Sequence, residues 1–249
     1  MTFSKYFTAI LSFLFLTSCS KYVGQNGITT PTTPTNPTTP TTAIVAPSIK
    51  FYSVMDNGSM NVLLNGKQAS SIANFYPSNY INGTNGNNTI SLRLPNSTTL
   101  LNGTVDLLNN TKYSCFFYKV GNEWKYSLIK DVMTATLANG FAAARILDFR
   151  TQGYFDYINV RLVNPGFEII DSKNRNFLDH HTYSSYTEFK QVGAGNYNIF
   201  MYNDTLTTSQ RKDVKIDSKA YYSIVLTTPS NITPYQNAIF YIFPDAIKH

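Results

Sequence analysis

The residues with metal-ligand chemistry that lie closest together in the sequence are Asp179, His180 and His181. Zinc sites normally take three or four ligands that are spaced along the chain. On a regular strand His180 and His181 point to opposite faces, so they cannot hold one ion, whereas in a loop they can. We expect no metal site here and no cofactor elsewhere.

Carboxylates and serines form no recognisable catalytic motif in the sequence. Gly-x-Ser-x-Gly, the nucleophile motif of many serine hydrolases, is absent. A glycosidase needs two carboxylates at a defined separation, but the only glutamates, Glu123, Glu168 and Glu188, do not recur between the two halves of the chain. Asp131 and Asp245 do recur, and each closes an apolar strand, where a turn-capping role is the simplest interpretation. We therefore predict no catalytic residues and no enzyme activity.

Cys19 has the clearest predicted chemistry. Lys5 is followed by an apolar run of about 11 residues, which suits a signal peptide but is too short for the roughly 20 residues of a membrane span. The run ends in Leu16-Thr17-Ser18-Cys19, which resembles a bacterial lipobox. The resemblance implies that residues 1–18 are cleaved as a signal peptide and that Cys19 is lipidated. An ordinary secretory signal with an incidental cysteine is the alternative.

The residues after Cys19 bear on the membrane in which the protein is anchored. Ser20 stands where Asp would favour the inner membrane, so we expect a lipid anchor in the cell outer membrane. Lipoproteins displayed on the surface of Bacteroidetes often carry acidic residues here, and Ser20-Lys21-Tyr22 departs from that pattern. A periplasm-facing and a surface-exposed location both stay open.

Residues 19–47 are predicted to form a tether. The segment is rich in Thr and Pro, and Pro31, Pro34, Pro37 and Pro40 recur in step with the three-residue turn of polyproline II. Such a segment buries too little apolar surface to offset its ordering entropy. At about 3.1 Å per residue, a fully extended spacer of about 20 residues could hold a domain up to roughly 60 Å from the membrane.

The composition of the remaining residues favours an all-β fold. Aromatic residues make up 14% of the chain and charged residues only 14%, and long helical patterns are absent. The formal net charge of +6 includes Lys5, and no dense basic run exists, so nucleic acid is not expected as a partner. Once Cys19 is acylated, Cys115 has no disulfide partner, and we expect it to be buried and unreactive.

Two copies of one unit follow the tether. Residues 59–66 (SMNVLLNG) match residues 157–166 (YINVRLVNPG), and residues 87–94 match residues 196–203, with Ile90 opposite Ile199. Fifteen residues later in each copy, Val105 matches Val214. The equal spacing predicts one domain over residues 48–137 and a second over residues 141–249.

Each copy contains about seven short strand patterns separated by Asn-Gly and similar turns, which predicts an immunoglobulin-like β-sandwich. Tyr113 and Tyr222 each follow a polar turn and open an apolar strand, which is the position of the tyrosine corner. Together with the lipobox and the tether, these repeated blocks resemble bacterial lipoproteins that carry domain of unknown function 4397. The resemblance covers residues 47–245 and implies two tandem immunoglobulin-like sandwiches at the cell envelope. It supplies no catalytic residues.

The second copy is longer by about eleven residues within residues 164–189. We expect the extra residues to form a protruding loop or hairpin, in which Tyr183 and Tyr186 are exposed and contribute to partner binding. The alternative is that Phe167, Ile169 and Phe177 cover an open sheet edge.

The function expected from the sequence is a non-enzymatic binding or structural role at the envelope, with a protein or glycan partner. The alternative is a glycan-active enzyme or its accessory carbohydrate-binding subunit.

Overall fold

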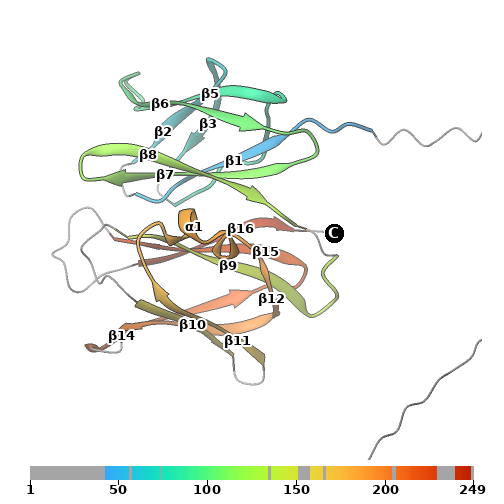
Figure 1. Cartoon of the computed structure of the whole chain (residues 1–249), viewed down its shortest axis with the longest axis vertical. Coiled ribbons are helices and arrows are strands. Elements are labelled where there is room, and N and C mark those ends of the chain that lie inside the picture. The colour runs from blue at the N-terminus through green and yellow to red at the C-terminus, as the bar shows by residue number, and fades with distance from the viewer. Residues whose placement is uncertain are drawn as a thin grey trace, which may run out of the picture. The chain divides into compact units, whose positions relative to one another are not determined.

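The computed structural model describes residues 43–55, 58–73, 75–133, 136–150, 158–164, 167–203, 206–228 and 239–247. The predicted signal peptide, Cys19 and all but the last five residues of the predicted tether lie outside these ranges. Residues from Ala43 to His249 belong to one compact unit (Figure 1). Among the described residues, no helix has the length and apolar character needed to cross a membrane.

The first copy of the repeat forms two four-stranded sheets, and its strands are β1 (Ser48–Ser53), β2 (Met60–Leu64), β3 (Lys67–Ile72), β4 (Ile81–Asn82), β5 (Gly86–Arg93), β6 (Thr99–Leu107), β7 (Lys112–Val120) and β8 (Glu123–Asp131). One sheet has the order β4-β1-β7-β8, and the other has the order β3-β2-β5-β6. Strand β1 is parallel to β7, and the other pairs are antiparallel.

The second copy repeats this topology, and its elements are β9 (Phe141–Phe149), β10 (Ile158–Asn164), β11 (Phe167–Arg175), α1 (Asp179–Thr182), the 3-10 helix η1 (Ser184–Tyr186), β12 (Lys190–Gly193), β13 (Gly195–Asn203), β14 (Leu206–Ile216), β15 (Ala220–Thr227) and β16 (Ile239–Ile247). Its sheets have the orders β12-β9-β15-β16 and β11-β10-β13-β14, and β9 is parallel to β15. Each strand of the first copy therefore has a counterpart eight places later.

Strand register confirms the alignment of the two copies. Leu64 pairs with Ile90 in the first copy, and the matching Leu162 pairs with Ile199 in the second. Val105 pairs with the residue two places before Ile90, and Val214 pairs with the residue two places before Ile199. The repeat that is visible in the sequence is thus a repeat of hydrogen-bonded pairing.

The predicted all-β sandwich is confirmed, and its strand order adds a detail that the sequence did not reveal. In constant-type immunoglobulin domains the sheets contain strands ABED and CFG, so the first strand pairs with the second. Here the first strand of each copy lies beside the seventh and pairs with it in parallel. The copies share the sandwich architecture of immunoglobulin domains but not this strand order.

Alternation of side chains places one core inside each sandwich. In β2 and β5 every second residue is buried, and Val62, Leu64, Ile90 and Leu92 belong to the core of the first copy. Val160, Leu162, Ile199 and Met201 take the matching places in the core of the second. Each core is thus closed by the two sheets of its own copy.

Strands β7, β9 and β15 lack this alternation because both of their faces are buried. A further apolar cluster joins the two copies, and it contains Tyr52, Val54, Phe116, Tyr118, Ile129, Leu147, Phe149 and Val225. The rings of Phe116 and Phe149 lie 5.2 Å apart. The sheet β4-β1-β7-β8 therefore packs against the sheet β12-β9-β15-β16, and each also covers its own core.

Both predicted tyrosine corners are present. The backbone N–H of Leu108 donates to the hydroxyl of Tyr113 over 3.1 Å, and the N–H of Asp217 donates to the hydroxyl of Tyr222 over 2.9 Å. The two bonds span the same five residues of sequence. Two residues after Tyr113, Cys115 is fully buried, and burial raises the pKa of its thiol, so it remains protonated and unreactive.

Replacing either corner tyrosine with Phe is expected to lower the free energy of unfolding by about 1 kcal/mol, the net value of a typical hydrogen bond. Urea unfolding of Tyr113→Phe and Tyr222→Phe checks this, with Tyr76→Phe as a control because Tyr76 is 75% exposed. Equal stability of all three variants and the wild-type protein would contradict the role given to the two hydroxyls.

Candidate functional site

Buried ion pairs and hydrogen bonds lie at the junction between the two copies and beside it in the second copy. Three buried arginines each pair with an aspartate: Arg145 with Asp131, Arg150 with Asp148, and Arg175 with Asp179. The first pair joins the two copies, and the other two lie within the second copy. Buried charges are costly unless they are paired and hydrogen-bonded. These three arginines satisfy that condition, because each is paired with a carboxylate.

Asp131 and Arg145 connect the first copy to the second. Both side chains are fully buried, and Asp131 Oδ1 lies 2.8 Å from Arg145 Nη2. Oδ1 accepts no hydrogen bond, so this contact is held by charge alone. Oδ2 accepts hydrogen bonds from the hydroxyls of Ser114 and Tyr80, over 2.8 and 2.9 Å. The interpretation of Asp131 as a turn cap is thus wrong, because its carboxylate faces the junction.

Arg145 is held from both copies. Its Nε donates to Ser223 Oγ over 2.7 Å within the second copy, and its Nη2 donates to Ser114 Oγ over 3.1 Å across the junction. The guanidinium carbon lies 4.3 Å from the centre of the Phe189 ring. Hydrogen bonds and ring stacking thereby fix the arginine opposite Asp131.

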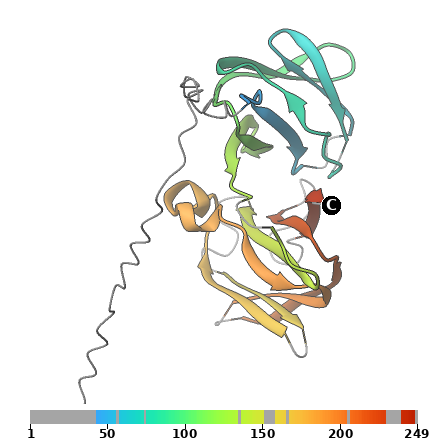
Figure 2. The same cartoon turned by 90° about the vertical axis from the view of Figure 1, so that its right-hand side faces the viewer.

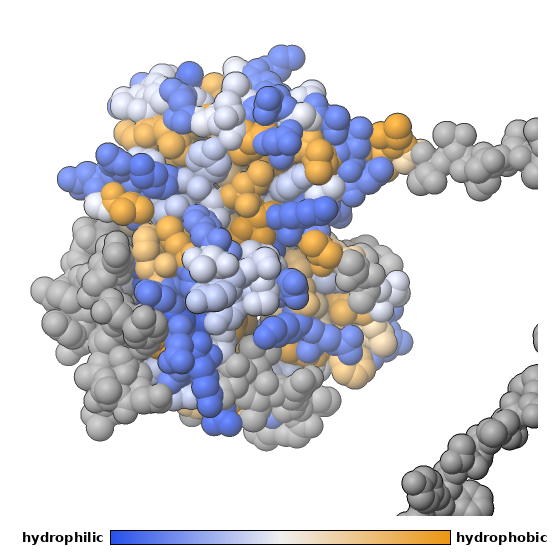
Figure 3. Space-filling view, viewed as in Figure 1, coloured by the Kyte–Doolittle hydropathy of each residue, from blue (hydrophilic) through white to orange (hydrophobic). Residues whose placement is uncertain are grey.

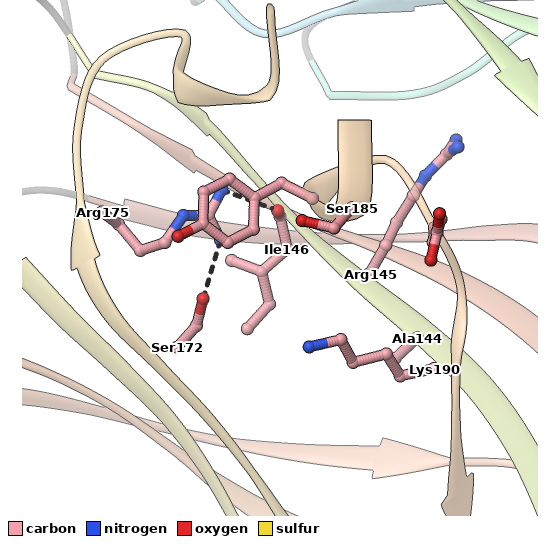
Figure 4. Close-up of a pocket in the computed structure, with 9 residues that line it drawn as sticks. Ala144, Arg145, Ile146, Ser172, Arg175, Ser185 and Lys190 are labelled. Atoms are coloured by element: carbon pink, nitrogen blue, oxygen red, sulfur yellow. Dashed lines mark hydrogen bonds between the residues drawn. The ribbon is translucent and has the colours of Figure 1, made fainter. Parts of the chain in front are cut away.

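Arg175 fixes the segment that leads into α1. Its Nε donates to Asp179 Oδ2 over 2.6 Å, and its Nη2 donates to Asp179 Oδ1 and to the carbonyl oxygen of Ile146. Its Nη1 donates to Ser172 Oγ (Figure 4). The ring of Tyr186 lies 4.1 Å from the guanidinium carbon. The neighbouring cavity, of about 20 Å³, has room for about one water molecule. This arrangement orders the segment and leaves no space for a substrate.

The sequence cluster Asp179-His180-His181 lies on α1, where Asp179 and His180 are buried. In the described part of the chain, no three His, Cys, Asp or Glu side chains come together as metal ligands. His180 and His181 instead face Ser127 of the first copy, with Nε2 to Oγ distances of 3.2 and 2.8 Å. The pair therefore links α1 to β8.

One arrangement of protons satisfies this contact. His180 Nδ1 is buried without a hydrogen-bond partner, which is least costly if it carries no proton. His180 Nε2–H then donates to Ser127 Oγ, and the Ser127 hydroxyl donates to His181 Nε2. A serine bonded to an imidazole is also how a nucleophile is activated. However, Ser127 is buried, and no carboxylate of the described residues bonds to His181, so the geometry favours a structural contact.

Protonation of His180 is expected to weaken the junction. Burial above all, and then the neighbouring His181, Arg175 and Arg145, lower its pKa from 6.5 to about 3. The unfolded chain therefore takes up a proton near pH 6.5 that the folded chain does not. The stability from neutral His180 is present above pH 6.5 and is lost as the pH falls towards 3, by about 1.4 kcal/mol per pH unit.

Urea unfolding between pH 7.5 and 5 measures this loss above the range in which ordinary carboxylates titrate. His180→Gln, which cannot gain a proton, should flatten the fall in stability relative to the wild-type protein. His181 has its pKa lowered by burial as well, so part of the slope should remain in this variant. An unchanged slope in His180→Gln would contradict the prediction.

The extra residues of the second copy do not protrude as a free loop. They lengthen β11 to nine residues, against six in β3, and form α1 and η1. Phe177 packs into the apolar cluster at the junction, while the side chains of Phe167 and Ile169 lie outside the described residues. Tyr183 is 57% exposed, as predicted, but Tyr186 is half-buried against Arg175. A role of these two tyrosines in partner binding stays a prediction.

Comparison of the chain with models of known protein families gives no match, and neither does comparison with curated proteins.

Proposed function

We propose that this protein is a lipid-anchored envelope protein with a non-enzymatic binding or structural role. In the mature protein, Cys19 carries the lipid and the tether holds the paired sandwiches away from the outer membrane. Its sequence features are those of the lipoproteins with tandem immunoglobulin-like domains that it resembles. The lipobox at Leu16-Thr17-Ser18-Cys19 supports the location.

One structural observation supports a role without catalysis. The groups best placed for chemistry are the three buried Asp–Arg pairs and the Ser127–His181 contact, and each of these side chains is engaged by another side chain of the protein. The Asp131–Arg145 pair, the Arg145–Ser114 bond and the His181–Ser127 bond join the two copies, and the cavity beside Arg175 has room for about one water molecule. Ser127 and His181 also line an open cleft, but no carboxylate of the described residues bonds to His181. The polar interior therefore serves to make a stiff module from two sandwiches.

Incubation of the mature chain with pools of cell-wall and plant polysaccharides tests the absence of catalysis. We expect no release of reducing ends above the level given by a heat-unfolded sample. Retention on a polysaccharide without product release would identify a glycan as the partner. Product release that is lost in Ser127→Ala would overturn the proposal in favour of the glycan-active alternative.

A further inference from the structure

Strand β8 has a hydrogen-bonded neighbour on one side only, β7, so its other side presents unpaired backbone groups. All nine residues of β8 pair with β7 without a register shift. In the described sheets every other edge strand longer than four residues, namely β3, β6, β11, β14 and β16, contains a register shift. Bulges of this kind are a common way to block pairing at an edge. The edge of β8 lacks that protection.

Backbone bonds of β7 show which groups of β8 face outward. The N–H of Ser48 donates to the carbonyl oxygen of Thr111, and the N–H of Val54 donates to that of Phe117, so the odd-numbered residues of β7 face β1. Tyr113 is one of these residues, and it pairs with Lys130. The N–H of Lys130 therefore faces the free edge, and Pro244, which pairs with the corner tyrosine of the second copy, has no N–H. The N–H groups of Leu128 and Tyr126 face the same way, because the pattern alternates.

An open cleft of about 660 Å³ runs along this edge. Five consecutive residues of β8, Tyr126 to Lys130, line one wall. Because successive side chains point to opposite faces, only the strand edge is common to all five. Residues of α1 and the segment after it, including Thr182 and Glu188, line the other wall. In Figure 2 this orange segment lies next to the yellow-green β8, and His181 of α1 contacts Ser127 of β8.

Exposed apolar side chains offer no comparable surface. The large ones among the described residues are scattered along the chain: Ile44, Val45, Tyr76, Leu108, Val120, Val132, Phe141 and Tyr183. On the face in Figure 3, hydrophobic and hydrophilic residues are interspersed over the described surface. A partner that binds through backbone hydrogen bonds fits the molecule better than one that needs a broad apolar patch.

We propose that the edge of β8 binds an extended peptide segment of a partner protein as an added strand. This inference rests on the proposed binding role and names its partner class. Backbone bonds to Tyr126, Leu128 and Lys130 would supply affinity, and alternate side chains would supply specificity. The side chains of Tyr126 and Leu128 are partly buried against the core of the first copy. The face of the peptide that lies beside them would therefore be apolar.

Charge defines the peptide further. Lys130 on one wall and Glu188 on the other make no ion pair with any described residue. A peptide with an acidic side chain near Lys130 and a basic one near Glu188 would pair with both. The second wall also favours a single strand over the edge of a second copy, because α1 and the residues after it flank the entrance.

Panning a phage-displayed library of random nonapeptides on residues 20–249 tests the proposal, because that chain retains the whole compact unit. The enriched peptides should alternate apolar and polar residues and bind as synthetic peptides in fluorescence polarisation. Lys130→Pro copies the proline of the second copy and removes one edge N–H. It should weaken binding about tenfold relative to Lys130→Ala, which removes the charge but keeps the N–H. Thr182→Trp, on the opposite wall, should also weaken binding.

Either of two results would overturn the proposal: no enrichment over uncoated beads, or equal binding by Lys130→Pro and Lys130→Ala. Dimerisation of the free chain that Lys130→Pro abolishes would also overturn it, because the edge would then pair with a second copy. A melting temperature for each variant shows whether it is folded. If Lys130→Pro is unfolded, peptide binding by Thr182→Trp tests the proposal instead, and unchanged binding by that variant would overturn it. These outcomes leave the membrane anchor and the absence of catalysis to be decided by their own tests.

Discussion

Replacing Arg145 with Met is expected to lower the free energy of unfolding by about 3–5 kcal/mol, the cost of leaving one member of a buried pair without its partner. Both side chains of the pair with Asp131 are fully buried, so water cannot take the place of the guanidinium. Ser114 and Ser223 also lose a donor in this variant. Urea unfolding of residues 20–249 at pH 7.5 measures the effect.

Two controls separate the charge pair from the loss of packing. Asp131→Asn combined with Arg145→Met removes both charges and should recover part of the loss, because the amide oxygen can still accept from Ser114 and Tyr80. Lys125→Met removes one member of an exposed pair with Glu123 and should change stability too little to measure. If Arg145→Met is no less stable than Lys125→Met, the buried pair does not hold the copies together.

Changing Cys19 to Ala is expected to move nearly all of the protein from the membrane fraction to the soluble fraction. Anchoring by acyl chains requires the cysteine sulfur, and stable anchoring takes more than one chain. Among the described residues, no helix could replace the anchor by crossing the membrane. Immunoblots of separated membrane and soluble fractions measure the change.

Ser20→Ala is the matched control, since it alters the neighbouring residue and leaves the site of acylation intact. That variant should stay in the membrane fraction. If mature Cys19→Ala protein, from which the signal peptide has been cleaved, also stays there after a high-salt wash, the lipobox interpretation fails.

The sandwiches could be predicted because their signals are local. Val62, Leu64, Ile90 and Leu92 alternate with polar residues, so each strand reveals the face that it buries. The tyrosine corners were predicted for the same reason, since Tyr113 and Tyr222 mark the start of the same strand in both copies. Parallel pairing of the first and seventh strands joins residues far apart in sequence, and no local pattern encodes it.

The junction could not be predicted from the sequence, because strands that are buried on both faces show no alternation of apolar and polar residues. Strand β9 is buried along almost its whole length, so Arg145 and Asp148 look like charges that interrupt an apolar run. Charged residues within such a run are a usable signal, since a strand buried on both faces must pair them. The partner Asp131 lies in the other copy, and identifying it required the structure.

The segment with Tyr183 and Tyr186 shows how an insertion can mislead. Its length and aromatic content predicted a protruding loop or hairpin, yet Arg175, Asp179 and His180 within it are buried, and His180 contacts Ser127 of the first copy. An insertion in only one of two copies can serve the contact between them as well as contact with a partner. Deleting residues 172–184 would therefore remove part of the junction together with any binding surface.

Differential scanning calorimetry of residues 20–249 tests most directly whether the junction makes one module of the two copies. We predict a single transition whose calorimetric and van't Hoff enthalpies agree, because the sheets β4-β1-β7-β8 and β12-β9-β15-β16 share a buried cluster and the Asp131–Arg145 pair. Two separate transitions, one for each copy and neither shifted by Arg145→Met, would contradict this account.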